Sequence, residues 1–213
     1  MQPLRKYTET RLDPDSQDLV RDIWELGGWS QGRTADISQV EKAYGGTGWV
    51  LNQPARAFFT EFYGIADEFC FKFRRSDVER DNTNSEWSIG GNELSFDIGE
   101  ILYTVHATAA EDQITPDEKA LIARLDPHAV PVAESGFHMP GVLWACDDGS
   151  FLRTYYWSPE TVQTYQSVYD LFDHDLNHVR HTSELWISIG GYAKEWGVGN
   201  GYYQRKYDEE YGR

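Results

Sequence analysis

The chain has 213 residues, of which 40% are hydrophobic and 15% aromatic, and its formal net charge is −16 at pH 7. This length suits one domain with a sizeable core, and the apolar content excludes a disordered chain. Residues 81–179 hold 17 acidic side chains against three basic ones, whereas residues 1–80 hold 13 against 11. A field of this sign repels nucleic acids and anionic membranes and attracts basic partners, although an acidic surface also serves solubility alone.

Neither a membrane span nor a secretory signal is expected. No apolar run approaches the roughly 20 residues that cross a bilayer, and the N-terminal residues lack the apolar core of a signal peptide. Cys70 and Cys146 lie in apolar, strand-like runs, which predicts buried thiols and not a disulfide or a metal pair. We therefore expect a cytoplasmic protein without a cofactor.

Three helices are predicted near the N-terminus. The first has apolar residues at helical spacing, can be capped by Asp15 or Ser16, and ends at Gly27. Asp36 can cap the second. Asn52 can cap the third, whose apolar stripe consists of Ala55, Phe58, Phe59 and Phe62.

Strands are predicted next. Residues 69–73 alternate between apolar and other side chains, and residues 87–89 can form a short strand. Residues 97–107 fit either a helix or a strand. Thr115 opens a helix through a capping box with Glu118. A β-meander with a tight turn is predicted from three runs, residues 129–133, 142–146 and 151–157.

A long helix is predicted from residue 162 to about residue 181, after Ser158 and Pro159, and a late strand follows with alternating Leu185, Ile187 and Ile189. The predicted fold class is therefore α+β, in which N-terminal helices and a long C-terminal helix pack on a mostly antiparallel sheet. We expect three parts, which are an N-terminal arm (1–15), a single domain (16–182) and a C-terminal extension with a Gly/Tyr-rich tail (183–213).

One stretch carries a resemblance to a known family. The run Gly27-Gly28-Trp29-Ser30-Gln31-Gly32-Arg33 precedes a short amphipathic segment, then Gly48-Trp49-Val50-Leu51 and the helix that starts at Asn52. Pro131-Val132-Ala133-Glu134 and the segment from Leu143 to Gly149 form a second block. This order resembles the third family of the SUKH superfamily over residues 22–172. The chain departs from the family at Ala133, where the family usually has glycine.

The resemblance implies a SUKH-like domain and an immunity protein, which binds and neutralises a cognate protein toxin of a bacterial polymorphic toxin system and has no active site. The acidity favours a basic nuclease as the toxin. We expect the interface on residues 76–92, residues 134–141 and the acidic face of the last helix. The candidate partner-binding residues are Trp87, Glu134, Asp147, Asp148, Trp157, Asp170 and Asp173. A SUKH-like adaptor for an endogenous partner is the alternative, and the sequence leaves the oligomeric state open.

A metal-dependent enzyme is a third interpretation. His174 and His178 have the spacing of zinc ligands on a helix, and His181 follows. On a helix, Asp170 and the three histidines fall within a sector of roughly 80° opposite the apolar positions. The sequence therefore favours a solvated polar face over a metal site.

The paired carboxylates and the tryptophans have ordinary explanations. Asp147 and Asp148 are expected to form a turn, and no aromatic cleft residue stands near them in the sequence at a spacing that would indicate acid/base chemistry. Trp24, Trp49 and Trp144 are expected in the core. The other tryptophans, in predicted loops and element ends, suit a partly exposed binding surface: Trp29, Trp87, Trp157, Trp186 and Trp196.

Overall fold

The computed structural model describes residues 9–63, 65, 69–74, 88–90, 114–135, 141–156, 158–177, 180 and 184–189. Its helices are α1 (Leu19–Leu26), α2 (Ser38–Gly45), α3 (Gln53–Phe62), α5 (Pro116–Leu125) and α6 (Val168–Leu176). Its strands are β1 (Glu9–Leu12), β2 (Phe69–Arg74), β3 (Ser88–Gly90), β4 (Val130–Ser135), β5 (Gly141–Ala145), β6 (Phe151–Tyr155), β7 (Ser158–Tyr165) and β8 (Glu184–Ile189).

The strands form two antiparallel sheets. Sheet A has the order β1-β8-β2-β3 and joins segments that are far apart in the chain. Sheet B has the order β4-β5-β6-β7, in which each strand pairs with the next one in sequence. The predicted α+β class is confirmed, and sheet B contains the predicted meander plus one further strand.

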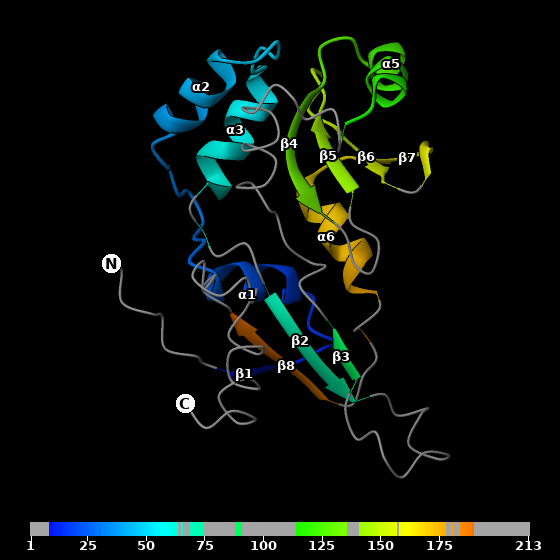
Figure 1. The fold of residues 1–213 in the computed structure, drawn as a ribbon. Helices are drawn as coiled ribbons and strands as arrows, with labels where there is room; N and C mark the ends of the chain where they lie inside the picture. Colours follow the sequence, from blue (N-terminus) through cyan, green and yellow to red (C-terminus); the bar gives the residue numbers. More distant parts are fainter. Residues whose placement is uncertain are drawn as a thin grey trace, which may run out of the picture.

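The helices lie on both faces of sheet B. Phe151 on β6 contacts Phe58 of α3 with ring centroids 6.1 Å apart, and Arg153, two residues along the strand, pairs with Asp175 of α6. Thr154 points to the opposite face and donates a hydrogen bond to Glu118 of α5. Helices α3 and α6 therefore share one face, and α5 covers the other. Figure 1 shows sheet B and α3 above, sheet A below, and α1 between them.

The caps of the predicted helices are confirmed in two cases. Asn52 Oδ1 accepts a hydrogen bond from Ala55 N at 2.8 Å, and Thr115 Oγ1 accepts one from Glu118 N at 3.2 Å. The predicted caps of α1 are wrong, because Asp18 occupies the N-cap position without a side-chain cap, while Ser16 Oγ accepts from Asp18 N. Helix α2 likewise begins one residue later than Asp36 predicts, since Ile37 is its N-cap residue.

The prediction of a long C-terminal helix is wrong. Residues 158–165 form β7, which pairs with β6, and α6 spans only nine residues from Val168 to Leu176. The segment 161–165 is rich in β-branched and aromatic side chains, which favour a strand. Ser167 then starts the helix, because its side chain accepts a hydrogen bond from Asp170 N at 3.1 Å.

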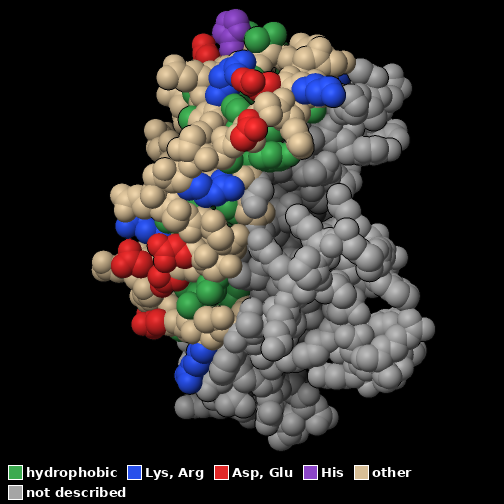
Figure 2. All heavy atoms as spheres, turned by 90° about the vertical axis from the view of Figure 1, so that its left-hand side faces the viewer, with side chains coloured by type: hydrophobic (Ala, Val, Ile, Leu, Met, Phe, Trp, Pro, Cys, Tyr) green, Lys and Arg blue, Asp and Glu red, His purple; other side chains and the backbone are tan. Residues whose placement is uncertain are grey.

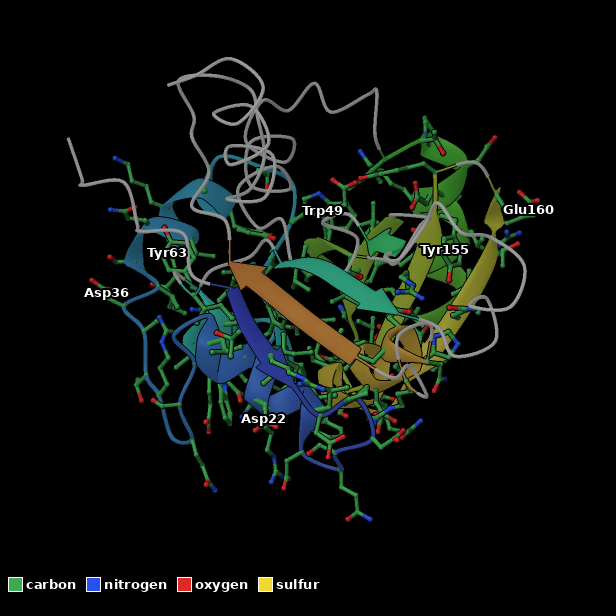
Figure 3. The ribbon with its side chains drawn as sticks, turned by 90° about the horizontal axis from the view of Figure 1, so that it is seen from below. Asp22, Asp36, Trp49, Tyr63, Tyr155 and Glu160 are labelled. Atoms are coloured by element: carbon green, nitrogen blue, oxygen red, sulfur yellow. The ribbon has the colours of Figure 1, made fainter. Side chains whose placement is uncertain are left out.

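Both outer segments of the described chain enter sheet A. Residues 9–12, within the predicted N-terminal arm, form the edge strand β1. The late strand predicted from Leu185, Ile187 and Ile189 is confirmed as β8, and it lies between β1 and β2. Figure 3 shows these three strands crossing in front of the helices and sheet B when the molecule is seen from below.

Several predicted core residues are confirmed. Trp24 is 4% exposed, Trp144 is completely buried, and Trp49 packs against Trp144 while remaining partly exposed. Cys146 is buried as a free thiol, and Cys70 lies on β2. None of the helices within the described ranges has the length and apolarity that a membrane span requires.

The departure from the SUKH pattern at Ala133 coincides with a local irregularity. The pairing of β4 with β5 shifts register between Pro131 and Ala133, as at a β-bulge. Ala133 is completely buried there, so the core accommodates its methyl group.

Candidate functional site

Two side chains from the segment 27–33 form hydrogen bonds with the C-terminal end of α3. Trp29 Nε1 donates a hydrogen bond of 3.0 Å to Glu61 Oε1. The Arg33 guanidinium donates to the carbonyl oxygens of Glu61 and Tyr63 at 2.7 and 2.6 Å. The last carbonyls of a helix lack intrahelical donors and carry partial negative charge, so Arg33 caps α3 electrostatically and by hydrogen bonding. The residues that carry the family resemblance therefore position α3 and the Glu61 carboxylate.

A groove with a volume of about 490 Å³ lies beside that helix. Residues of α3, the β5–β6 turn and the start of α6 line it, together with Trp24 from α1. Its floor is aromatic and consists of Trp24, Phe58, Phe62, Phe151 and Tyr169. These rings pack on one another at their edges, as in the pair Trp24–Phe62 with a centroid distance of 4.9 Å.

Three carboxylates belong to the same groove. Glu61 comes from α3, and Asp147 and Asp148 come from the β5–β6 turn. None of the described residues that line the groove is Lys, Arg or His. In contrast, acidic and basic side chains are interspersed on the face that Figure 2 shows. The groove is thus locally anionic with an apolar floor, which suits a cation on an apolar stem.

The turn that carries the two aspartates is well fixed. Asp147 N donates a hydrogen bond of 2.7 Å to Asp126 Oδ2, and Gly149 takes a φ of +90°, which favours glycine. Ser150 donates to Asp148 Oδ1 from its hydroxyl at 2.6 Å and from its backbone N–H at 2.8 Å. These hydrogen bonds lower the pKa of Asp148 and keep it ionised.

The electrostatics of Asp148 do not suit a general acid. A general acid at neutral pH needs a carboxyl with a raised pKa, whereas the pKa of Asp148 is lowered. The predicted turn at residues 147–149 is confirmed. The spacing of residues in the sequence did not indicate the aromatic side chains with which Asp147 and Asp148 share the groove.

The other predicted partner-binding residues are scattered. Asp170 is exposed on α6, where it accepts a hydrogen bond of 2.9 Å from Ser167 Oγ. Asp173 pairs with Arg180, and Glu134 is half-buried on β4, away from the groove lining. Trp87 and Trp157 lie outside the described residues, as do most of the two predicted interface segments, 76–92 and 134–141. The fold therefore brings Asp147 and Asp148 to the groove and leaves Glu134, Asp170 and Asp173 out of its lining.

Of the three histidines in the metal-site interpretation, the structure describes the side chain of His174. The His174 side chain is 52% exposed, as predicted, and its Nδ1 lies 3.1 Å from Asp175 Oδ1. The side chains of His178 and His181 lie outside the described residues. Within the described part of the chain, no three His, Cys, Asp or Glu side chains come together in a way that could hold a metal ion.

Sequence reasoning missed a buried ion pair on sheet B. Arg153 is 2% exposed, and its guanidinium donates to both Asp175 oxygens at 2.5 and 2.9 Å. Its Nη2 also lies within 3.1 Å of acceptors on Tyr155, Gln163 and Tyr165. Burial acts against the charge, but the hydrogen bonds and charge of Asp175 prevail and raise the pKa of Arg153. The sequence did offer a sign of this ion pair, because Arg153 stands within an apolar strand segment and a buried charge there needs a buried partner of opposite charge.

The opposite face of the sheet holds a second buried polar group. Glu118 is 3% exposed and accepts a hydrogen bond from Thr154, whose hydroxyl also accepts one of 3.1 Å from Trp144 Nε1. Burial raises the pKa of Glu118. Glu118 projects from α5 onto sheet B and does not line the groove, so its role is in the packing of α5 on the sheet.

No protein-family model, curated protein or solved structure matches this chain.

Proposed function

We propose that this chain is an immunity protein of the SUKH type, which binds a basic toxin stoichiometrically and blocks it. The observation that carries the proposal is the groove, in which Glu61, Asp147 and Asp148 surround an aromatic floor and no cationic side chain joins the described lining. A partner surface rich in Arg or Lys complements such a site in charge.

The charge of the whole chain supports the same function. The net charge of −16 accelerates encounter with a cationic protein and disfavours nucleic acid as the direct ligand. A basic nuclease is the toxin class that this field suits, because an acidic inhibitor occupies the surface that otherwise binds phosphates. The resemblance over residues 22–172 supplies the immunity role, and the groove supplies a place for contact.

Affinity capture from the native host tests the function. The full-length chain with an affinity tag is the bait, bound proteins are identified by mass spectrometry, and the complex is washed at rising salt. Recovery of a toxin, at one-to-one stoichiometry and with salt-sensitive binding, is the expected result. Co-expression of that toxin with the chain should restore growth of cells that the toxin alone kills.

Two results would overturn the proposal. A captured toxin that kills equally well with and without the chain would separate binding from protection. A housekeeping protein as the stoichiometric partner, without any toxin, would identify the chain as a SUKH-like adaptor. An acidic or membrane-inserted toxin would refute the nuclease assignment alone.

A further inference from the structure

We propose that the groove is an arginine-binding site, which receives a guanidinium group presented by a peptide segment of the partner. This inference rests on the proposed function for the identity of the partner, but not for the chemistry of the site. The groove offers negative charge and aromatic surface, and the side chain of a peptide arginine complements both.

The charge comes from carboxylates on two separate elements. Asp147 and Asp148 are adjacent on the turn, and Glu61 is held on α3 by its hydrogen bond from Trp29. A guanidinium has five N–H donors in a planar fork, so it can bridge neighbouring carboxylates where an ammonium acts as a point charge. Asp148 is kept ionised by Ser150, which makes it a permanent acceptor.

The aromatic floor also favours arginine over lysine. A guanidinium is more weakly hydrated than an ammonium and lies readily against aromatic rings. This protein uses that contact elsewhere, because Arg153 lies 5.2 and 5.3 Å from the ring centroids of Tyr155 and Tyr165. Arg21 lies 5.8 Å from the ring of Tyr169, on the α1 side of the groove and outside its lining. On the side of the groove that carries Asp147 and Asp148, the described lining includes no Lys or Arg side chain that could make the same contact.

The arginine is presented by a peptide segment because the proposed partner is a protein. Trp24 belongs to the groove lining and provides a tryptophan reporter for binding there.

A titration followed by NMR tests the site with defined probes. The probe is the capped tripeptide acetyl-Gly-Arg-Gly-amide, and its matched controls carry lysine or citrulline, the uncharged isostere of arginine, in the central position. We expect the arginine probe to shift the Trp24 indole N–H signal and the amide signals of residues 147–149 saturably at millimolar concentration. The citrulline probe should bind about tenfold more weakly, and the lysine probe should lie between the two.

Two double variants with equal charge change localise the effect. Asp147→Asn/Asp148→Asn should weaken the arginine probe about tenfold. The turn is retained in this variant, because the asparagine that replaces Asp148 keeps the Oδ1 that accepts from Ser150. The control Asp117→Asn/Glu160→Gln removes two charges from α5 and β7, and should change binding by less than about twofold. Figure 3 places Glu160 on the side of the molecule opposite Tyr63, which follows α3.

Three outcomes would overturn the arginine site: no saturable shift at the groove, equal binding of the citrulline probe, or equal losses in the two double variants. The function and the site can fail separately. A captured toxin that binds Asp147→Asn/Asp148→Asn as tightly as the unmodified protein would refute the site and leave the immunity function standing. Binding of the arginine probe at the groove, with a housekeeping protein and no toxin as the stoichiometric partner, would support the site and refute the immunity function.

Discussion

Replacement of Asp175 by asparagine leaves the buried Arg153 guanidinium without its counter-charge. Both side chains are at most 4% exposed, so water cannot substitute for the lost charge. Breaking a buried ion pair from one side costs about 3–5 kcal/mol, and we expect a value of about 3 kcal/mol because asparagine keeps one acceptor and nearly the same volume. Urea unfolding followed by tryptophan fluorescence measures this loss as a change in the free energy of unfolding.

The complementary variant removes the other partner. Arg153→Met leaves the Asp175 carboxylate buried without its counter-charge, and should also cost about 3–5 kcal/mol in the same unfolding assay. The double variant Arg153→Met/Asp175→Asn should cost less than the sum of Arg153→Met and Asp175→Asn, with a coupling of about 1–3 kcal/mol.

An exposed ion pair provides the control. Glu41 and Arg56 contact each other with side chains 44% and 47% exposed, so Glu41→Gln should cost less than about 1 kcal/mol. A loss from Asp175→Asn no larger than the loss from Glu41→Gln would refute the reasoning, because it would mean that burial does not amplify the interaction.

Three further predictions concern the stability of the fold. Arg33→Met should lower the free energy of unfolding by about 1–3 kcal/mol, because the α3 carbonyls lose two donors, and a loss within error in urea unfolding would contradict this cap. Burial raises the pKa of Glu118, so its carboxylate penalises the folded state increasingly as pH rises above the ordinary value of 4.5. Glu118→Gln should therefore gain stability relative to the unmodified protein as pH rises above 4.5, and a difference that stays constant with pH would be inconsistent with the raised pKa. Gly141→Ala should separate β5 from β6, since its Cβ would lie 1.7 Å from the Thr154 carbonyl oxygen, and circular dichroism should show loss of strand, whereas Gly45→Ala meets nothing within 4 Å and should unfold like the unmodified protein.

The parts of the fold that follow from local sequence were predictable. Helix α3 has a side-chain cap, a proline in its first turn and a regular apolar stripe, and each of these acts within one helical turn. The meander is likewise local, because a tight turn at residues 147–149 joins two apolar runs.

The region after residue 157 was not predictable in the same way. Val162, Tyr165, Val168 and Phe172 satisfy helical spacing, but the first two lie on a strand whose partner is β6. Pairing with an existing edge outweighed the helical pattern, and only tertiary structure carries that information. The order of sheet A is similarly invisible to local patterns, since β8 joins β1 and β2 across most of the chain.

For the groove, the sequence identified two of the three acids, but neither Glu61 nor the aromatic surroundings. Asp147 and Asp148 were candidates because of charge and turn position. Their aromatic neighbours come from α1, α3, β6 and α6, and no spacing rule relates these elements. Trp29 and Arg33 were noticed for a family pattern, and their contacts with Glu61 and Tyr63 explain why those residue types suit the positions.

The topology of the two sheets determines the order in which they can fold while the chain is being synthesised. Sheet B is complete once residue 165 has left the ribosome, because its strands pair with their neighbours in sequence. Sheet A must wait for residues 184–189, since β8 lies between β1 and β2 and holds them together. Until then β1 and β2 present unpaired edges, and closing the long loops between them is entropically slow. The nascent chain thus acquires the half that bears the Asp147–Asp148 turn first, and chaperone dependence should centre on the strands of sheet A.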